Sequence, residues 1–255
     1  MLSDTAAGQG FSISPSRIFF TGNPGETVTQ DITFTNTSPN ALSFITRIQD
    51  WKRDSSGTKI YYDSPQPGSN AKWISLSENS LVIQPGEVKQ VIVSLHIPTG
   101  VSKLSHTMLF FTQVKEQQKP KVTDVAIGVN VLMEVGVQIY YTPKGLQAGE
   151  LEFLAFDDRG IVNNGEKKSR RLALKIHNKG DINKDAFLRL ELTNKETGEE
   201  VKIEPRTIAM LPDETQWVMI DLPAGLKGKY LTVAMLDAGS TYDLKVAEKE
   251  IIYRP

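Results

Sequence analysis

A long alternating segment between Ala126 and Pro143 constrains the fold of this chain more than any other feature. Successive side chains of a β-strand point to opposite faces, so an apolar residue at every second position predicts a strand with one apolar face. That face consists of Ile127, Val129, Val131, Met133, Val135, Val137 and Ile139. Strands usually run about 3–10 residues, and a sandwich of that depth cannot cover a longer apolar face. Either these residues are core residues of their own domain, or part of the face receives a strand from a partner.

The composition is that of a soluble globular protein, with 255 residues of which 39% are hydrophobic and 23% charged. The net charge of -1 lacks the basic excess of a nucleic-acid-binding surface. There is no cysteine, which excludes disulfides, thiolate metal sites and cysteine nucleophiles. No apolar run reaches the roughly 18 residues of a transmembrane segment.

Residues 1–10, at the start of the chain, are mostly small and polar and contain no apolar core of a signal peptide. We interpret it as a tag remnant or as the frayed start of a mature chain from which a signal peptide has been removed.

Turn signals with Gly, Pro and Asn recur about every 8–12 residues, which is typical of a β-sandwich and predicts an all-β chain. In the first half the predicted strands are Phe11–Ile13, Arg17–Thr21, Thr27–Thr35, Ser43–Trp51, Ile74–Ser77, Ser80–Ile83, Val88–Ile97, Met108–Val114 and Val125–Tyr141. In the second half they are Glu150–Phe156, Arg171–His177, Phe187–Thr193, Glu200–Ile203, Thr207–Met210, Thr215–Asp221, Lys229–Asp237 and Val246–Tyr253.

The two halves share a weak internal duplication on either side of a Pro- and Gly-containing linker, Thr142–Gly149. Val28–Ser38 has the pattern of Arg170–Gly180, an alternating strand that ends at an Asn-containing turn. Later, Leu81–Val93 resembles Ile208–Ile220, where a strand, a Pro turn, an acidic residue and a second strand follow each other. The duplication favours two β-sandwiches in tandem, with one larger sandwich as the alternative.

Five motifs follow each other in the first half. They are Ser14–Gly22 around Arg17, Ile32–Ser38 with its Asn turn, the corner Pro85–Glu87, the aromatic strand Met108–Val114, and Val135–Pro143 with its aromatic pair. In this order the segment from Phe11 to about Pro143 resembles the PapD-like periplasmic chaperones, which assist pilus and fimbrial subunits. The resemblance implies two tandem immunoglobulin-like β-sandwich domains, 11–143 and 150–255. The second half resembles the family only in being a further immunoglobulin-like domain.

The resemblance also implies a binding site. In the family's pilus chaperones an Arg and a Lys hold the C-terminal carboxylate of the client, and the matching positions here are Arg17 and Gln138. A hydrogen bond to a charged partner is worth about 1.5–3 kcal/mol, and loss of the second cation removes part of that attraction. The alternative for Arg17 is a surface position or a local ion pair. The family also adds its long strand to the client's sheet, with side chains that match Ile127, Val129, Val131 and Met133.

We therefore expect a periplasmic chaperone-like protein that binds a pilus- or fimbrial-type subunit by strand donation, without a cofactor. An outer-membrane assembly protein is a further expected partner, and the apolar edge also allows a homodimer. The alternative, favoured by Gln138, is a structural or adhesive immunoglobulin-like module of a cell-envelope complex without chaperone activity. A carbohydrate-binding module would need an exposed platform built from Trp51, Trp73 or Trp217.

Enzymatic activity is not expected. His96, His106 and His177 have no metal-ligand spacing, and the sequence contains no nucleophile elbow, P-loop or dinucleotide fingerprint.

Overall fold

The computed structural model describes residues 10–114, 132–164 and 167–253. In this part of the chain the regular structure is β except for one short 3-10 helix, η1 (Ala71–Trp73), which confirms the predicted all-β class. The chain divides into two compact units, 1–51 with 61–144 and 52–60 with 145–255. The domain bounds expected from the sequence, 11–143 and 150–255, stay a prediction.

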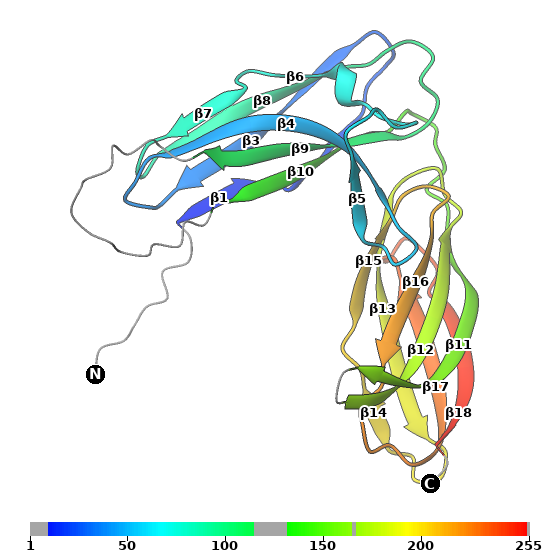
Figure 1. Ribbon diagram of the computed structural model, residues 1–255. Helices are drawn as coiled ribbons and strands as arrows, with labels where there is room; N and C mark the ends of the chain where they lie inside the picture. Colours follow the sequence, from blue (N-terminus) through cyan, green and yellow to red (C-terminus); the bar gives the residue numbers. More distant parts are fainter. Residues whose placement is uncertain (1–9, 115–131, 165–166, 254–255) are drawn as a thin grey trace, which may run out of the picture. The chain divides into compact units, whose positions relative to one another are not determined.

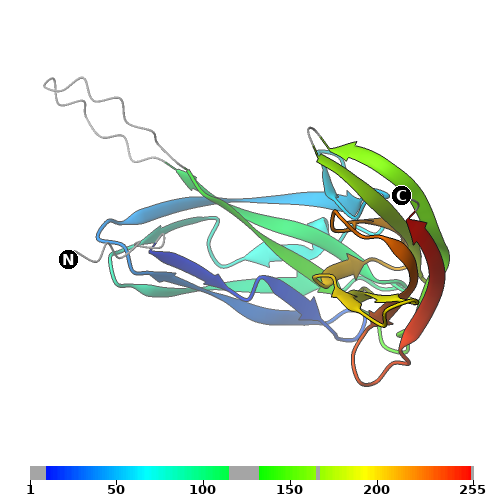
Figure 2. The ribbon, with the colours of Figure 1, turned by 90° about the horizontal axis from the view of Figure 1, so that it is seen from below.

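The first unit is a sandwich of two sheets, which Figures 1 and 2 show from two directions. The described strands of one sheet follow the order β1-β3-β8-β6, and those of the other follow β2-β10-β9-β4-β5 with β7 beside β4. The strands are β1 (Phe11–Ser14), β2 (Arg17–Phe20), β3 (Thr27–Asn36), β4 (Leu42–Arg53), β5 (Lys59–Tyr62), β6 (Ile74–Leu76), β7 (Ser80–Ile83), β8 (Val88–His96), β9 (Ser105–Val114) and β10 (Glu134–Tyr141).

The core of the first unit lies between its two sheets. Alternate residues of β3 and β8, such as Ile32 and Val91, meet Leu109 of β9 and Ile139 of β10, and each of these side chains is fully buried. The alternation in sequence therefore corresponds to an inner and an outer face of each sheet.

The second unit repeats this plan with two further sheets. One has the described order β11-β12-β16, and the other has β14-β13-β17-β18 with β15 beside β13. The strands are β11 (Leu151–Asn164), β12 (Lys167–Asn178), β13 (Lys184–Asn194), β14 (Glu200–Lys202), β15 (Arg206–Met210), β16 (Thr215–Asp221), β17 (Gly228–Asp237) and β18 (Lys245–Tyr253). Leu174 and Ile176 of β12 pack with Leu188 and Leu190 of β13 in a separate core.

Strand β10 is shorter than predicted where the structure describes it. The sequence predicts one strand over Val125–Tyr141, but β10 begins at Glu134, and Met133 precedes it outside any strand. The pairing partner ends here, because Thr112 lies opposite Glu134 and β9 ends at Val114. Of the apolar face, Ile127, Val129 and Val131 lie outside the described residues.

The β11–β12 hairpin is longer than predicted. The predicted strands ended at Phe156 and began at Arg171, whereas β11 continues to Asn164 and β12 begins at Lys167. Register shifts between Phe153 and Ala155 and between Asp158 and Ile161 mark bulges in β11. A bulge shifts the side-chain alternation by one residue, so the period-two pattern stops there although the pairing continues. Strand β5 was missed altogether.

The predicted duplication is visible in the hydrogen bonds of two buried asparagines. Asn36 ends β3, and its side-chain Nδ2 donates to the carbonyls of Asn40 (2.8 Å) and Ile83 (3.0 Å). Asn178 ends β12, and its Nδ2 donates to the carbonyls of Ile182 (2.9 Å) and Leu211 (3.0 Å). In each unit the amide ties the end of one strand to the Pro-containing corner that follows another.

The corners themselves also correspond. In the first unit the Gln84 N–H donates to the Glu87 carboxylate over 2.6 Å, and Gly86 between them has a φ of 74°. In the second unit the Leu211 N–H donates to the Glu214 carboxylate over 2.6 Å, and Asp213 has a φ of 57°. Positive φ suits Gly and is tolerated by Asp, which explains why these two residues occupy matching positions.

The ionisation of Glu214 should make the stability of the second unit depend on pH. Burial raises the pKa of its carboxyl, against the opposing effects of the Leu211 N–H and the Arg53 charge. A folded-state pKa above the unfolded one means that stability falls as the pH rises from about 4.5, the ordinary value, through the folded pKa. Glu214→Gln keeps an oxygen acceptor but cannot ionise, so the variant should gain stability relative to the native protein as the pH rises from about 4 to about 7.

Urea unfolding of both proteins across this pH range, followed by Trp217 fluorescence, measures the difference. A difference in the free energy of unfolding that stays constant with pH would contradict the assignment to Glu214.

Candidate binding edge on strands β2 and β10

One edge of strand β10 is only partly covered. On one side β10 pairs antiparallel with β9 from Glu134 to Tyr141. On the other side it pairs parallel with β2, and this register runs only from Gln138 opposite Arg17 to Tyr141 opposite Phe20. Among the described strands none pairs with Glu134–Val137 on the β2 side. This part of β10 is therefore a strand edge that no described strand covers.

Main-chain hydrogen bonds identify which residues face this edge. Gln138 donates its N–H to the Ser16 carbonyl (3.1 Å), and Thr142 donates to the Phe20 carbonyl (3.0 Å), so even-numbered residues turn toward β2. Met133 turns the other way, because its carbonyl accepts from the Gln113 N–H (2.8 Å). Main-chain groups alternate in direction along a strand. Glu134 and Gly136 thus direct their N–H and C=O groups to the unpaired edge.

The chain itself explains why the edge begins where it does. Strand β1 pairs with β3 in the opposite sheet, and only after Pro15 and Ser16 does the chain join β10 as β2. Upstream of Ser16, therefore, no described strand occupies the position beside β10 that β2 occupies downstream.

The structure brings two of the predicted site residues together. Arg17 and Gln138 are register partners on adjacent parallel strands, so their side chains lie on the same face of the sheet. Both are partly buried, and on the other side of Gln138 lies Met108 of β9. The client-binding roles of these residues stay a prediction.

Met133 lies at the start of this edge and is partly buried, with its N–H 3.2 Å from the Gln113 side-chain oxygen. Val137 and Ile139 of the same predicted apolar face are fully buried in the core of their own unit. This end of the apolar face therefore belongs to the core of its own domain, which is one of the two alternatives that the sequence left open.

Sequence reasoning missed Tyr140. Its ring stacks on Phe19 of β2 (ring centroids 5.1 Å apart, planes at 10°) and lies 6.1 Å from the His106 ring and 6.3 Å from the Trp51 ring. Its hydroxyl donates to the Gln138 Oε1 over 2.7 Å. The signal was present, because residues two apart in a strand share a face, and Tyr140 follows Gln138 by two.

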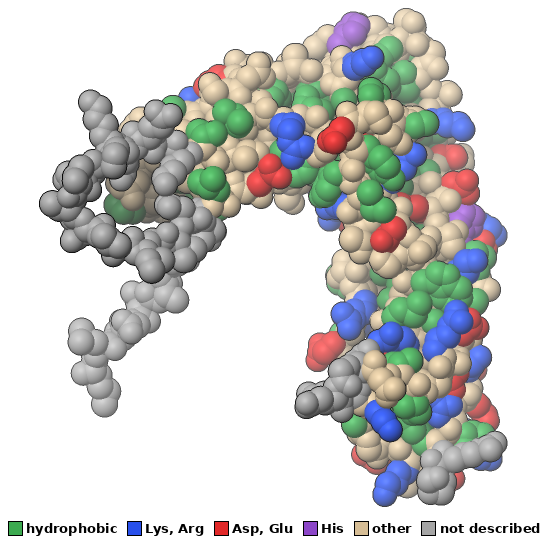
Figure 3. All heavy atoms as spheres, viewed as in Figure 1, with side chains coloured by type: hydrophobic (Ala, Val, Ile, Leu, Met, Phe, Trp, Pro, Cys, Tyr) green, Lys and Arg blue, Asp and Glu red, His purple; other side chains and the backbone are tan. Residues whose placement is uncertain are grey.

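The charges around the edge are mixed. Arg47 pairs with Glu134 (3.4 Å), and its guanidinium lies 4.5 Å from the centre of the Phe110 ring. On the face that Figure 3 presents, basic and acidic side chains alternate among apolar ones and form no patch of one sign. This mixture agrees with the net charge of -1.

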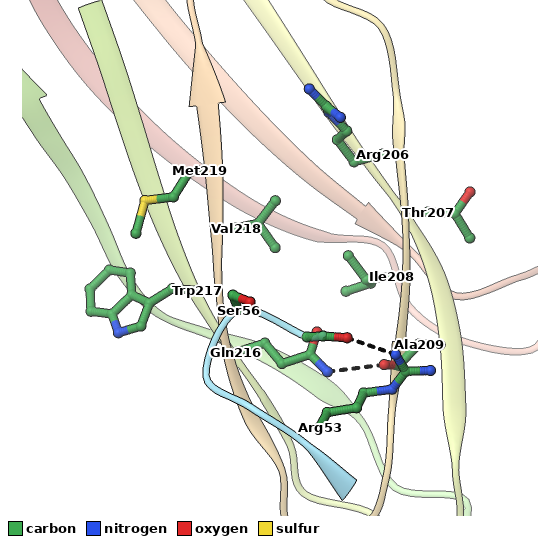
Figure 4. A pocket seen from close by; sticks show the side chains of 11 residues that line it. Arg53, Ser56, Arg206, Thr207, Ile208, Ala209, Gln216, Trp217, Val218 and Met219 are labelled. Atoms are coloured by element: carbon green, nitrogen blue, oxygen red, sulfur yellow. Dashed lines mark hydrogen bonds between the residues drawn. The ribbon is translucent and has the colours of Figure 1, made fainter. Parts of the chain in front are cut away.

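A separate pocket of about 420 Å³ lies in the second unit, between the segment around Arg53 and strands β15 and β16. Gln216 donates to the Ala209 carbonyl and Arg53 donates to the Gly57 carbonyl, as the dashed lines in Figure 4 mark. Arg206 points away from Arg53 in the same view, so the two cations do not converge on one ligand position.

The tryptophans do not form the platform of a carbohydrate-binding module. Trp51 is 1% exposed, and Trp73 packs against the core of the first unit. Trp217 is partly buried, and the guanidinium of Arg159 and the amine of Lys175 lie 4.9 Å and 5.7 Å from the centre of its ring.

Among the described residues no group of His, Asp and Glu side chains is arranged to hold a metal ion. In the same part of the chain no helix is long and apolar enough to span a membrane.

Comparison with solved structures identifies the fold. One match is to a chain of the CsuC–CsuE chaperone–tip adhesion subunit pre-assembly complex from the archaic chaperone-usher Csu pili of Acinetobacter baumannii, with a TM-score of 0.54 and 13% identity over 93% of this chain and 97% of the other. Another is the YadV chaperone, with a TM-score of 0.51 and 12% identity over 95% of this chain and all (100%) of the other. The chain has the fold of the PapD-like pilus chaperones.

This PapD-like fold confirms the two tandem immunoglobulin-like sandwiches that the resemblance implied. No protein-family model matches the chain. No curated protein matches it either. The PapD-like likeness is therefore a likeness of structure, carried by topology rather than by sequence identity.

Proposed function

We propose that this PapD-like protein is a periplasmic, non-enzymatic chaperone that binds a pilus- or fimbrial-type subunit by adding strand β10 to the client's sheet. The unpaired edge at Glu134–Val137, which ends at Arg17 and Gln138, is the observation that carries this proposal. The chaperones with a similar fold, one of them in a complex with a tip adhesion subunit, support the same class of partner.

The direction of β2 supports a specific orientation of the client strand. Because β2 runs parallel to β10, a client strand that lies upstream on the same line and runs in the same direction ends beside Ser16 and Arg17. Its C-terminal carboxylate would then lie next to the Arg17 guanidinium and the Gln138 amide. The main-chain groups of Glu134 and Gly136 would pair with the client backbone, as in other cases of β-strand addition.

The apolar side chains give the strand its specificity. Met133 lies at the start of the described edge, and the alternating residues Ile127, Val129 and Val131 precede it in sequence. An apolar strand edge without a partner is an aggregation hazard, which a client strand would relieve. We infer that these side chains fill the groove of an incomplete subunit sandwich until an outer-membrane assembly protein receives the subunit.

A matched pair of substitutions tests the edge. Glu134→Pro removes the N–H that faces the client and places a ring in its path, while the pairing with β9 does not use this N–H. Glu134→Ala loses the same side-chain contacts with Thr112 and Arg47 but keeps the N–H. We expect Glu134→Pro to weaken client binding by about tenfold or more and Glu134→Ala to leave it near the native level.

The measurement is a crosslinked pull-down of the native protein and both variants from the envelope fraction of the native host, with bound chains identified by mass spectrometry. The expected result is a β-rich surface subunit that Glu134→Pro loses and Glu134→Ala retains. Equal recovery by the two variants would exclude the edge as the binding site and favour a structural module. Recovery of this chain alone would indicate a homodimer.

A further inference from the structure

The sheets that contain β8 and β16 differ by one strand. In the first unit β8 lies between β3 and β6, in the order β1-β3-β8-β6. In the second unit the corresponding strand β16 pairs with β12, in the order β11-β12-β16, and no described strand lies on its other side. The second unit thus has no counterpart of β6 among the described strands, although Leu81–Val93 and Ile208–Ile220 correspond along their whole length.

Met219 lies where this difference leaves β16 uncovered. Trp217 donates its N–H to the Ser55 carbonyl (2.7 Å), away from β12, so odd-numbered residues of β16 direct their main-chain groups to the uncovered edge. In the first unit the corresponding residue is Ile92, whose N–H donates to the Ser77 hydroxyl (3.0 Å) and whose carbonyl accepts from the Ser77 N–H (3.0 Å). No described strand offers matching groups to Met219.

A pocket of about 420 Å³ lies beside this edge, between β16 and β15. Val218 of β16 and Ile208 of β15 line its two sides (Figure 4). In the first unit β6 supplies Ile74 and Leu76 at the corresponding edge, and both side chains pack against the core. The second unit therefore has open space where the first has the apolar side chains of a fourth strand.

The charges around the pocket favour an acidic ligand. Arg53 and Arg206 line the pocket, and no aspartate or glutamate of the described residues does. The charge of Arg53 already acts on the buried Glu214 carboxyl, whereas Arg206 is exposed on the β15 side. Because opposite charges across an interface attract and fix its register, Arg206 is the residue that an acidic side chain of a ligand would meet.

The first unit supplies a template for the acidic position. Glu78, two residues after β6, pairs with Lys89 of β8 (2.8 Å). Lys89 corresponds to Gln216, which lines the pocket in the second unit. An acidic residue at the same place in an added strand would therefore lie at the pocket that Arg206 lines.

We propose that the uncovered edge of β16 is a second strand-addition site, which binds an extended segment of a partner protein. The segment runs antiparallel to β16, as β6 runs to β8, and carries two apolar residues separated by one polar residue, with an acidic residue two positions after the second. Strand addition takes its affinity from main-chain hydrogen bonds and its specificity from alternate side chains. This site lies in the second unit and goes beyond the client site proposed on β10.

A peptide copied from the first unit is the probe. It has the sequence of residues 73–79, Trp-Ile-Ser-Leu-Ser-Glu-Asn, with an acetylated N-terminus and an amidated C-terminus, and is titrated into the 15N-labelled full chain. The Met219 backbone N–H signal should shift, because this group gains a hydrogen bond, whereas the Glu134 and Gly136 signals should not. The same peptide with Lys in place of Glu should bind about threefold more weakly, since it is repelled by Arg206.

Two pairs of variants locate the site. Met219→Pro removes the N–H that faces the edge and should weaken binding about tenfold, whereas Met219→Ala keeps this N–H and should bind about as tightly as the native protein. Arg206→Glu should remove the preference for the acidic peptide. Lys229→Glu, at an exposed position outside the pocket, should keep it.

An unchanged Met219 signal at millimolar peptide would overturn the inference, as would equal binding of the two peptides. Shifts at Glu134 and Gly136 without one at Met219 would assign the peptide to the β10 edge and reject the site on β16. A Met219 signal that moves with protein concentration alone would place a second copy of this chain at the edge and reject a different partner. Because the β10 edge is read from its own signals, each of these failures is distinct from a failure of the proposed function.

Discussion

Asn36→Ala should lower the free energy of unfolding of the first unit by about 3 kcal/mol. Asn36 is fully buried, and its side chain donates to the carbonyls of Asn40 and Ile83 and accepts from the Ser38 N–H (3.0 Å) and hydroxyl (2.6 Å). Each hydrogen bond contributes about 1 kcal/mol, and a buried carbonyl left without a donor costs about 1–3 kcal/mol. Asn178→Ala should have a similar effect on the second unit, where the amide makes the matching contacts.

Urea unfolding, followed by fluorescence, separates the two effects because Trp51 and Trp73 lie in the first unit and Trp217 in the second. Asn40→Ala is the control, since Asn40 is exposed and takes part in the turn through its main-chain groups. It should change stability by no more than about 0.5 kcal/mol. If Asn36→Ala cost no more than this control, the buried amide would not be what holds the strand end to the corner.

Gly180→Ala should destabilise the second unit by about 3 kcal/mol, because the new methyl group has no space. A Cβ at Gly180 would lie 2.3 Å from the Ala148 carbonyl oxygen and 3.0 Å from the Gly149 Cα. Both neighbours are backbone atoms of the segment that precedes β11, and the Asp181 N–H donates to the Gln147 carbonyl beside them (3.0 Å). Backbone atoms cannot turn aside as a side chain can, so the segment 147–149 must shift.

Gly225→Ala separates this steric effect from the conformational preference of glycine. Gly225 has a φ of 83°, and a Cβ there would meet no atom within 4 Å, so its replacement should cost only about 1 kcal/mol of strain. Urea unfolding monitored at Trp217 measures both variants. Equal losses for Gly180→Ala and Gly225→Ala would show that the close approach of segments 147–149 and 180 contributes nothing of its own.

Part of the candidate site could be predicted from the sequence, because the motif around Arg17 and the Tyr-Tyr-Thr-Pro ending after Gln138 are local patterns. Their side-by-side position on β2 and β10 agrees with that reading. Tyr140 was passed over because an aromatic residue near the end of an alternating strand normally belongs to the core, whereas here it lies on the opposite face from Val137 and Ile139. The sequence pattern also missed part of the β11–β12 hairpin. The bulges in β11 interrupt the alternation of side chains, and strand prediction depends on that alternation.

The sequence alone determined the all-β class, most of the strands and the two Asn-containing corners, because alternation and turn chemistry are properties of short segments. Only the tertiary structure decided that β2 pairs with Gln138–Tyr141 and that no described strand pairs with Glu134–Val137 on the same side of β10. It also decided that Gly149 and Gly180 must stay without side chains and that Tyr140 reaches Gln138. The physical reason is that an edge, a close backbone approach and an aromatic stack each depend on segments far apart in the chain, and no local pattern records which segments meet.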